Sequence, residues 1–254
     1  MTRPRPRLVI FGAVKVAAVV SLAFSWPLAL ALWVATDLWL FWQMFWVPAR
    51  GLGPVHATFR PDGRDVWLTI DDGPDPVQTS AILTLLAAHR ARATFFVIGR
   101  HAAAFPELVR AILAAGHEIA LHTHTHPAKS FWFAGPRRIA AELEQSLAAV
   151  RRAGATPTRF RPPVGLKSPW LHPPLAARGL RCIAWTARGR ERAGPDARTV
   201  FQRLWRGVRP GAILLLHEGE AVPPPIRLEV IRLTLERLRA ENYTAVIPRD
   251  DQLA

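Results

Sequence analysis

From residue 64 to the end of the chain, short apolar runs alternate with longer amphipathic segments. Seven apolar runs have the length of β-strands, and they lie at 66–70, 93–98, 118–121, 159–161, 180–185, 212–216 and 243–247. Between them, six segments have the apolar spacing of helices, and they lie at 77–89, 106–115, 136–152, 169–177, 196–208 and 226–240. Strands that alternate with helices form parallel sheets joined by right-handed crossovers. Seven strands favour an α/β fold of the distorted (β/α)7 barrel type over an open doubly wound sheet.

The first 50 residues have a different pattern. Residues 8–47 are apolar apart from Lys15, Asp37, Gln43 and a few small polar residues, which is long enough for one tilted transmembrane helix or two short ones. A Ser-Trp-Pro sequence at 25–27 divides the stretch into two segments. The chain is therefore expected to have three parts, a membrane anchor at 1–50, a linker at 51–63 and an α/β domain at 64–254.

A cleavable signal peptide is the alternative interpretation of the apolar stretch. The apolar part of a signal peptide is usually shorter, and no small-x-small cleavage site follows, so we expect an anchor in a bacterial-type inner (cytoplasmic) membrane. Three arginines precede the stretch and indicate a cytoplasmic N-terminus. One span would then export the rest of the chain, whereas a hairpin of two would return it to the cytoplasm. The sequence alone leaves both topologies open.

The chain carries a formal net charge of +14, almost all of it from arginine, because only three residues are lysines. Such a charge can serve nucleic-acid binding, but the arginines are scattered and no nucleic-acid motif accompanies them. We expect no nucleic-acid partner and instead a basic protein beside anionic lipid. The single cysteine, Cys182, excludes an intrachain disulfide and lies in an apolar run, where it is expected to fill core.

Residues with catalytic chemistry come directly after several of the predicted strands. Asp71 and Asp72 follow the first strand, His122 and His126 the third, and His217 the sixth. The carboxyl ends of parallel strands meet at one edge of a β/α barrel, where such barrels carry their active sites. These five side chains are therefore expected to gather in one place.

Adjacent carboxylates with paired imidazoles are typical of a metal-dependent hydrolase. Imidazole and carboxylate ligands suit Zn and its neighbours, and a catalytic site commonly has three protein ligands and an open position for water. His122 and His126 can supply two ligands and one aspartate the third, which leaves the other aspartate as the base for the water. Zn is the expected metal, although this ligand set also accepts Co, Ni or Fe.

The motifs at these strand ends resemble those of the polysaccharide deacetylases, the NodB-like enzymes of carbohydrate esterase family 4. They are residues 69–74 (TIDDGP), 116–119 (GHEI), 122–127 (HTHTHP), 161–165 (RPPVG) and 214–217 (LLLH). The similarity extends from about Val66 to Ile247 and excludes the membrane segment. It implies a deformed (β/α) barrel and a metal-dependent enzyme that removes an N- or O-acyl group from a sugar.

The same resemblance implies a role for individual residues. Asp71 resembles the catalytic base of the family, Arg161 the arginine that holds this aspartate, and His217 the catalytic acid. The residues that resemble the metal ligands are Asp72, His122 and His126.

Residues of the third and fourth motifs are expected to line the substrate site, and they are Pro162, Val164, Trp185, Arg188 and Glu191. Val164 stands where the family usually has tyrosine, but the role attributed to that position is a backbone N–H, which valine retains. The Asp-x-x-Asp-Trp motif of the family resembles residues 188–192 (RGRER). Glu191 can replace the second aspartate, which supports the acid histidine. Arg188 inverts a charge, which favours an anionic substrate such as a phosphate-linked sugar.

Together these features predict a membrane-anchored deacetylase that hydrolyses an N-acyl (acetamido or formamido) group of a cell-envelope polysaccharide or lipid-linked sugar. An exported catalytic domain suits polymers such as chitin or peptidoglycan, and a cytoplasmic one suits a lipid-linked sugar. The alternative is a non-catalytic carbohydrate-binding or scaffold protein on a deacetylase fold. The altered fourth motif favours this alternative, and the complete set of base, ligands, arginine and acid disfavours it.

Overall fold

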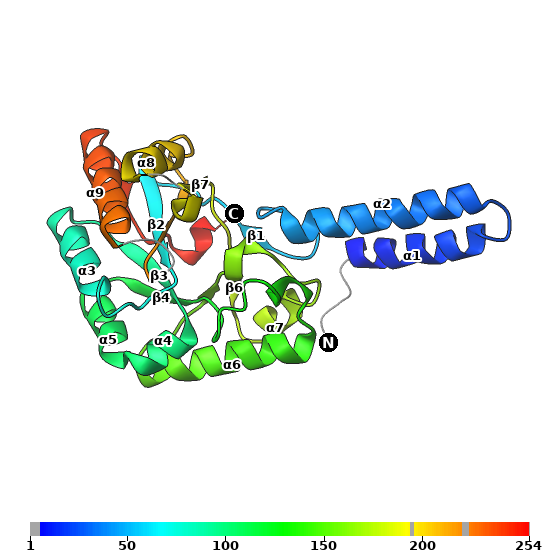
Figure 1. The fold of residues 1–254 in the computed structure, drawn as a ribbon, viewed down its shortest axis with the longest axis horizontal. Helices are drawn as coiled ribbons and strands as arrows, with labels where there is room; N and C mark the ends of the chain where they lie inside the picture. The colour runs from blue at the N-terminus through cyan, green and yellow to red at the C-terminus, as the bar shows by residue number, and fades with distance from the viewer. Residues whose placement is uncertain (1–5, 194–195, 220–223, 254) are drawn as a thin grey trace.

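The computed structural model describes residues 6–193, 196–219 and 224–253. The molecule consists of an α/β domain and two antiparallel helices, α1 (Pro6–Ser21) and α2 (Trp26–Phe45), which project from the side of this domain (Figure 1).

The α/β domain is built on one sheet of parallel strands in the order β1-β6-β5-β4-β3-β2-β8-β7, with β9 paired to β2. The strands are β1 (Val55–His56), β2 (Asp65–Asp71), β3 (Ala93–Val97), β4 (Glu118–Leu121), β5 (Arg159–Phe160), β6 (Arg181–Ile183), β7 (Ala187–Arg188), β8 (Ile213–His217) and β9 (Thr244–Ala245). Among the described strands, β1 and β7 end this path without pairing to each other. The fold is therefore a distorted parallel half-barrel, which confirms the predicted class.

The seven predicted strands are all present, and the sheet has two more, β1 and β7. Each of these has two residues, which is too short to produce an alternating pattern in the sequence. Their neighbours define them instead, since Val55 pairs with Cys182 of β6 and Ala187 with Leu214 of β8. The segment 51–63, expected as a linker, thus contributes β1 to the sheet and the buried Phe59 to the barrel interior.

Helices cover the outside of the sheet (Figure 1). They are α3 (Thr79–Ala88), α4 (Gly99–Ala104), α5 (Pro106–Ala114), α6 (Pro136–Arg152), α7 (His172–Ala176), α8 (Ala197–Trp205) and α9 (Pro224–Ala240), with 3₁₀ turns η1 (Phe131–Phe133), η2 (Pro163–Gly165), η3 (Glu191–Ala193) and η4 (Asp250–Gln252). The six predicted helices are present, and the short α4 is additional.

Strand β2 shows how the sheet separates core from site. Successive side chains of a strand point to opposite faces. Val66, Leu68 and Ile70 belong to the large core between sheet and helices. Trp67 belongs to a second cluster inside the barrel, together with Phe96, and Asp71 lies on the same face of β2 as Trp67. Burial of each large apolar side chain contributes roughly 1.5–3 kcal/mol, so the strand places Asp71 rigidly at its end.

The projecting helices form a hairpin. Ser25 caps α2 by accepting a hydrogen bond from the Leu28 backbone N–H, which ends the turn between the two helices. Midway along the hairpin, Nζ of Lys15 in α1 lies 2.7 Å from Oδ1 of Asp37 in α2, so the two charges of the apolar stretch pair with each other. Within the described residues, one helix, α2, is long and apolar enough to cross a membrane.

The end of α2 is fixed to the α/β domain by polar contacts. Gln43 Oε1 accepts a hydrogen bond from the Gly51 backbone N–H at 2.8 Å. The ammonium group of the buried Lys167 donates to the backbone carbonyls of Trp46 (2.7 Å) and Val47 (2.8 Å), which follow the helix. The hairpin is thus held at a defined position on the domain.

Candidate active site

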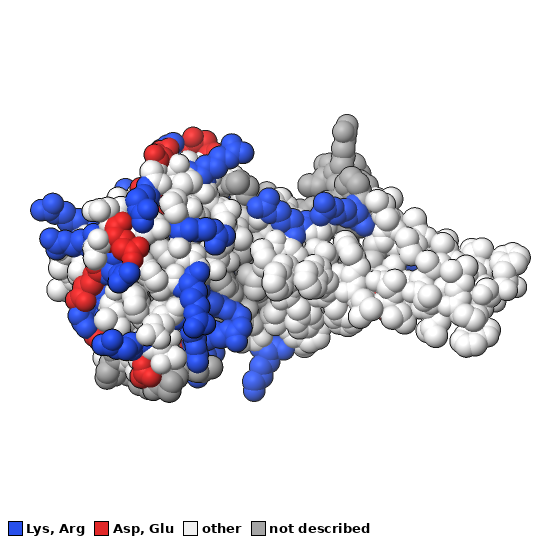
Figure 2. Space-filling model, turned by 90° about the horizontal axis from the view of Figure 1, so that it is seen from above, with Lys and Arg blue, Asp and Glu red and all other residues white. Residues whose placement is uncertain are grey.

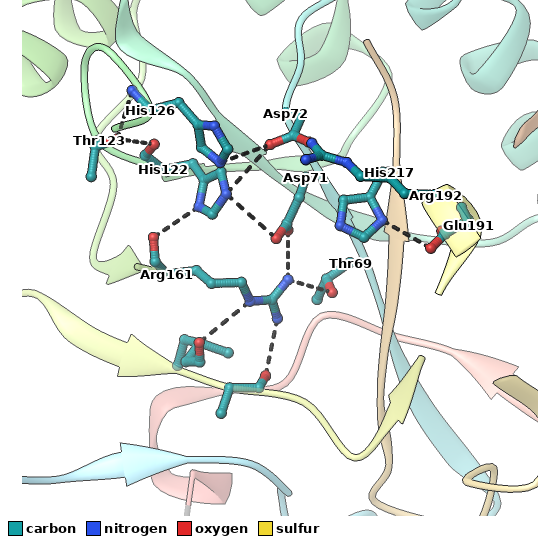
Figure 3. A network of polar contacts seen from close by, with 12 residues as sticks. Thr69, Asp71, Asp72, His122, Thr123, His126, Arg161, Glu191, Arg192 and His217 are labelled. Atoms are coloured by element: carbon teal, nitrogen blue, oxygen red, sulfur yellow. Dashed lines mark hydrogen bonds and ion pairs between the residues drawn. The ribbon is translucent and has the colours of Figure 1, made fainter. Parts of the chain in front are cut away.

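The predicted catalytic residues meet at the carboxyl edge of the sheet. Asp71 and His217 are paired positions at the ends of the neighbouring strands β2 and β8. His122 follows β4, and Arg161 follows β5. Asp71, His122 and His217 line one cavity of about 190 Å³, and Figure 3 shows their side chains pointing toward one another.

A cluster that fits a metal ion is formed by Asp72, His122 and His126. Oδ1 of Asp72 lies 3.5 Å from Nε2 of His122 and 3.3 Å from Nε2 of His126 (Figure 3). Ligands 2.0–2.1 Å from a tetrahedral Zn lie roughly 3.3 Å apart, so these two distances match, and all three ligand atoms lie within 4.8 Å of one another. Oδ1 of Asp72 is also buried without a hydrogen-bond partner, which is costly unless a cation satisfies it. The cluster is therefore suited to a divalent metal.

Hydrogen bonding and burial prepare both imidazoles for this role. Nδ1 of His122 lies 2.8 Å from the carbonyl oxygen of Arg161, so Nδ1 carries the proton and Nε2 presents its lone pair to the cluster. Burial lowers the pKa of His122 to about 4, and burial with the neighbouring His122 lowers the pKa of His126 to about 4. Both rings are thus neutral at pH 7, the form that binds a metal.

The loop that carries the two histidines is held by a buried carboxylate. Oε2 of Glu142, in α6, accepts hydrogen bonds from the backbone N–H groups of His124 (2.7 Å) and Thr125 (2.8 Å). The His124 ring packs against Gly99, where an added Cβ would lie 2.6 Å from its Nδ1. His124 therefore points away from the cavity that His122 and His126 line.

Asp71 is held by a fully buried arginine. Nη1 of Arg161 donates to Oδ1 of Asp71 at 2.6 Å and to Oγ1 of Thr69 at 2.9 Å, and its other nitrogens donate to backbone carbonyls of Ile183 and Ala184 (Figure 3). Burial raises the pKa of Asp71 to about 6, although the positive charge of Arg161 opposes the shift. The carboxyl group is therefore mostly ionised at pH 7. Its pKa also lies near the working pH, as a general base requires.

His217 lies on the other side of Asp71 and has its own carboxylate partner. Its Nδ1 is 3.1 Å from Oε2 of the buried Glu191, in η3. Burial alone would lower the pKa of His217, but the charge of Glu191 and those of the two aspartates raise it to about 9. The imidazole is therefore protonated at pH 7.

Unfavourable backbone conformations concentrate in this region. Of seven non-glycine residues with positive φ in the described chain, five lie in or beside the cavity: Asp72, Thr123, His126, Val164 and Arg190. Val164 has φ 51° and ψ 13°, which is rare for a β-branched residue. Such conformations cost on the order of 1–3 kcal/mol each and are typically retained at functional sites.

The cavity is lined by most of the residues expected to contact substrate, since Val164, Trp185, Arg188 and Glu191 all face it. Pro162 does not line this cavity and lies instead at a separate small gap, which Trp185 also lines.

Sequence reasoning missed two arginines that also line the cavity, Arg190 and Arg192. Nη2 of Arg192 lies 3.1 Å from Oδ2 of Asp72, the oxygen that points away from the imidazoles. The sequence feature that could have indicated them is the run of basic residues around Glu191. Without a structure, such a run is typical of a solvated surface.

Comparisons with known proteins agree with this geometry. A profile of the family "Polysaccharide deacetylase" matches residues 59–182. The chain is 39% identical over 172 residues to a chitooligosaccharide deacetylase of Bradyrhizobium sp. (strain ANU 289), covering 67% of this chain and 75% of that protein. It is 30% identical over 156 residues to a peptidoglycan-N-acetylglucosamine deacetylase of Bacillus cereus, covering 61% of this chain and 72% of that protein.

A similar solved structure is a family 4 carbohydrate esterase from Streptomyces lividans in complex with acetate. The TM-score is 0.68 at 29% sequence identity, over 76% of this chain and 96% of the other. The fold and the site define a hydrolase that acts on non-peptide C–N bonds of linear amides. The chain belongs to the polysaccharide deacetylase family, carbohydrate esterase family 4, and is a carbohydrate deacetylase.

Proposed function

We propose that this protein removes the N-acyl group from an acylated amino sugar of the cell envelope, with a divalent metal held by Asp72, His122 and His126. The observation that carries the proposal is that this cluster shares one cavity with Asp71 and His217, whose pKa values of about 6 and about 9 suit a base and an acid at pH 7. When bound, the metal would polarise the acyl carbonyl and lower the pKa of water; Zn suits these ligands, and Co, Ni or Fe are acceptable.

Asp71 acts as the general base. Its carboxylate takes the proton of the attacking water, while the Arg161 guanidinium, 2.6 Å away, keeps it oriented toward the cavity. The negative charge that develops on the acyl oxygen needs a donor nearby. The backbone N–H of Val164 serves as that donor, and the left-handed conformation of this residue at the cavity wall supports the assignment.

His217 acts as the general acid. Its protonated imidazole gives a proton to the departing amine as the C–N bond breaks, since amine expulsion requires protonation. Glu191 positions the ring through Nδ1 and keeps it charged, which leaves Nε2 for the leaving group. Glu191 therefore acts through His217 rather than by contact with substrate.

The N-terminal hairpin anchors the enzyme in a membrane. Of the 21 large hydrophobic residues that are exposed in the described chain, 17 lie between Val9 and Trp46. A contiguous apolar surface of this extent needs a non-aqueous environment. Figure 2 agrees, because the hairpin is almost entirely uncharged while basic side chains cover the α/β domain. At 1.5 Å per residue, α2 extends about 30 Å, the thickness of a bilayer core.

The catalytic domain faces the cytoplasm. Both ends of the hairpin lie at the α/β domain (Figure 1), so a hairpin that crosses the membrane with both the 20-residue α2 and the shorter, 16-residue α1 leaves the N-terminus and the domain on one side. Arginines flank the hairpin at that end, at positions 7 and 50. Positive charge favours the cytoplasmic side. A reporter fused after Ala254 tests this topology, because alkaline phosphatase should be inactive there and a fluorescent protein active.

The function itself is tested by acyl release. Purified full chain with Zn should release acetate or formate from an N-acylated amino sugar, and a chelator should stop the release. A protein that binds metal and sugar but releases no acyl group from a broad substrate panel would be a binding protein on a deacetylase fold, and the proposal would be wrong.

A further inference from the structure

A second groove adjoins the active-site cavity on the side of β7 and α8. It has a volume of about 680 Å³, and four of its seven lining residues are arginines: Arg188, Arg190, Arg203 and Arg206. Arg188 and Arg190 also line the active-site cavity, so the two spaces share a wall. None of the residues that line the groove is acidic.

Two glycines bring these arginines together. A Cβ at Gly189 would lie 2.4 Å from Cγ1 of Val200 in α8, so only glycine lets the strand end pack this closely on the helix. A Cβ at Gly207 would lie 2.8 Å from Cα of Ala187 in β7. The loop after β7 and the end of α8 are therefore in backbone contact from both sides. The arginines of the groove come from these two packed segments, which fixes their spacing.

Three of the four arginines of this groove, Arg188, Arg190 and Arg206, carry the argument for an anionic ligand. In the described part of the chain, no carboxylate lies within 4.0 Å of the guanidinium of Arg188, Arg190 or Arg206. Burial and the neighbouring Arg190 lower the pKa of Arg188, and the charge of Glu191 opposes this shift without cancelling it. Like charges held together gain free energy when an anion binds between them. The groove is thus prepared for a negatively charged ligand.

We propose that the arginine groove binds a phosphate group of the substrate, so that this enzyme deacylates an amino sugar that carries a phosphate ester or diphosphate. The inference rests on the proposed function, since it needs the acylated sugar at the metal cluster and its phosphate in the adjoining groove. Guanidinium groups bind phosphate oxygens in pairs, and several from two directions can enclose one phosphate. An uncharged sugar polymer would supply no anion to Arg188, Arg190 and Arg206.

Two substrates with the same acyl group separate this idea from the function itself. One is N-acetylglucosamine linked through a diphosphate to a short prenyl chain, and the other is uncharged N-acetylchitotetraose. Wild-type protein should have a kcat/KM at least tenfold higher for the diphosphate substrate. That preference should shrink as salt rises, because salt screens exposed charges. Turnover of neither substrate would contradict the proposed function, whereas equal turnover of both would contradict only the phosphate site.

Arg206→Gln supplies the residue-level test. Arg206 lines the groove but not the active-site cavity. Arg206→Gln should lower the ratio of the two kcat/KM values about tenfold, which is the effect of losing one charge-assisted contact. Arg206→Lys should retain part of the preference. Arg198→Gln is the matched control, because Arg198 is an exposed arginine at the start of α8, the helix that Arg206 directly follows, and it does not line the groove. The ratio should stay unchanged in this variant. An unchanged ratio in Arg206→Gln would overturn the assignment.

The phosphate could instead belong to a membrane lipid, and vesicles distinguish this source. Binding to phosphatidylglycerol vesicles should be equal for wild type and Arg206→Gln if the groove serves the substrate. A variant that loses vesicle binding but keeps the substrate ratio would assign the groove to lipid head groups and overturn the substrate site.

Discussion

Glu191 and His217 form an ion pair in which Oε2 of the carboxylate lies 3.1 Å from Nδ1 of the imidazole. The resemblance to the polysaccharide deacetylases leads one to expect an aspartate as the support of the acid histidine. Glutamate is longer by one methylene, and here it lies on the short η3 turn after β7, from which it reaches the ring while its side chain stays buried. The altered fourth motif thus retains the contact that an acid histidine needs.

Removal of this pair should shift the pH dependence of activity. His217 must be protonated to act as an acid, so kcat/KM should fall as pH rises through the pKa of about 9. Glu191→Gln removes the charge that raises this pKa, and the fall should therefore move to lower pH. The measurement is the pH profile of kcat/KM with a substrate whose own groups do not titrate between pH 6 and 10.

Glu191→Asp is the control for this effect. This variant keeps the negative charge on a side chain that is one methylene shorter. The fall of its kcat/KM at high pH, the basic limb of the profile, should therefore lie nearer to that of wild type than the basic limb of Glu191→Gln. Identical basic limbs in wild type and Glu191→Gln would show that Glu191 does not set the pKa of His217.

Replacement of Asp71 by Asn should abolish turnover and leave the metal bound. The amide is similar in shape but cannot accept the proton of the water, and a loss of at least 10²-fold in kcat is expected for a general base. The metal content of Asp71→Asn should equal that of wild type, because Asp72, His122 and His126 are retained. Unchanged turnover in this variant would overturn the mechanism.

Replacement of His126 by Ala should remove metal binding while the fold persists. The side chain supplies one of three ligand atoms that lie within 4.8 Å of one another. We expect metal content after dialysis to fall well below one ion per chain, and added Zn should raise the melting temperature of wild type but not of the variant. His124→Ala is the matched control from the same loop, since its ring lies outside the cavity. Equal metal content in His126→Ala and wild type would exclude His126 as a ligand.

A buried acid behind the site should make stability depend on pH. Glu218 accepts a hydrogen bond from Oγ1 of Thr79 at 2.6 Å, and burial raises its pKa to about 8. Between its ordinary pKa of 4.5 and 8 the folded state holds a proton that the unfolded state has lost, so stability falls as pH rises through this window.

Glu218→Gln removes this ionisation. The difference in melting temperature, variant minus wild type, should increase from pH 5 to pH 9 when metal-free protein is measured in detergent. Parallel pH dependence in the two proteins would show that Glu218 does not titrate in this range.

The sequence predicted the strand ends well because the motif residues directly follow short apolar runs, which indicate buried parallel strands. Asp71 and His217 could be placed at one edge before their pairing in register was known. Strand β7 was harder, since its two residues come directly after the predicted strand at 180–185 and have no apolar run of their own. Arg203 and Arg206 were missed for a different reason. They reach the groove only through the close packing of α8 on β7, which is a tertiary contact that one sequence does not display.

The central claim is metal-dependent hydrolysis of an N-acyl sugar. The most direct test is acetate and formate release by the purified full chain from N-acylated oligosaccharides and lipid-linked sugars, with Zn and with chelator. The account predicts release with Zn, loss with chelator and recovery when Zn is restored. Release that persists in chelator from protein shown to be free of metal would contradict it.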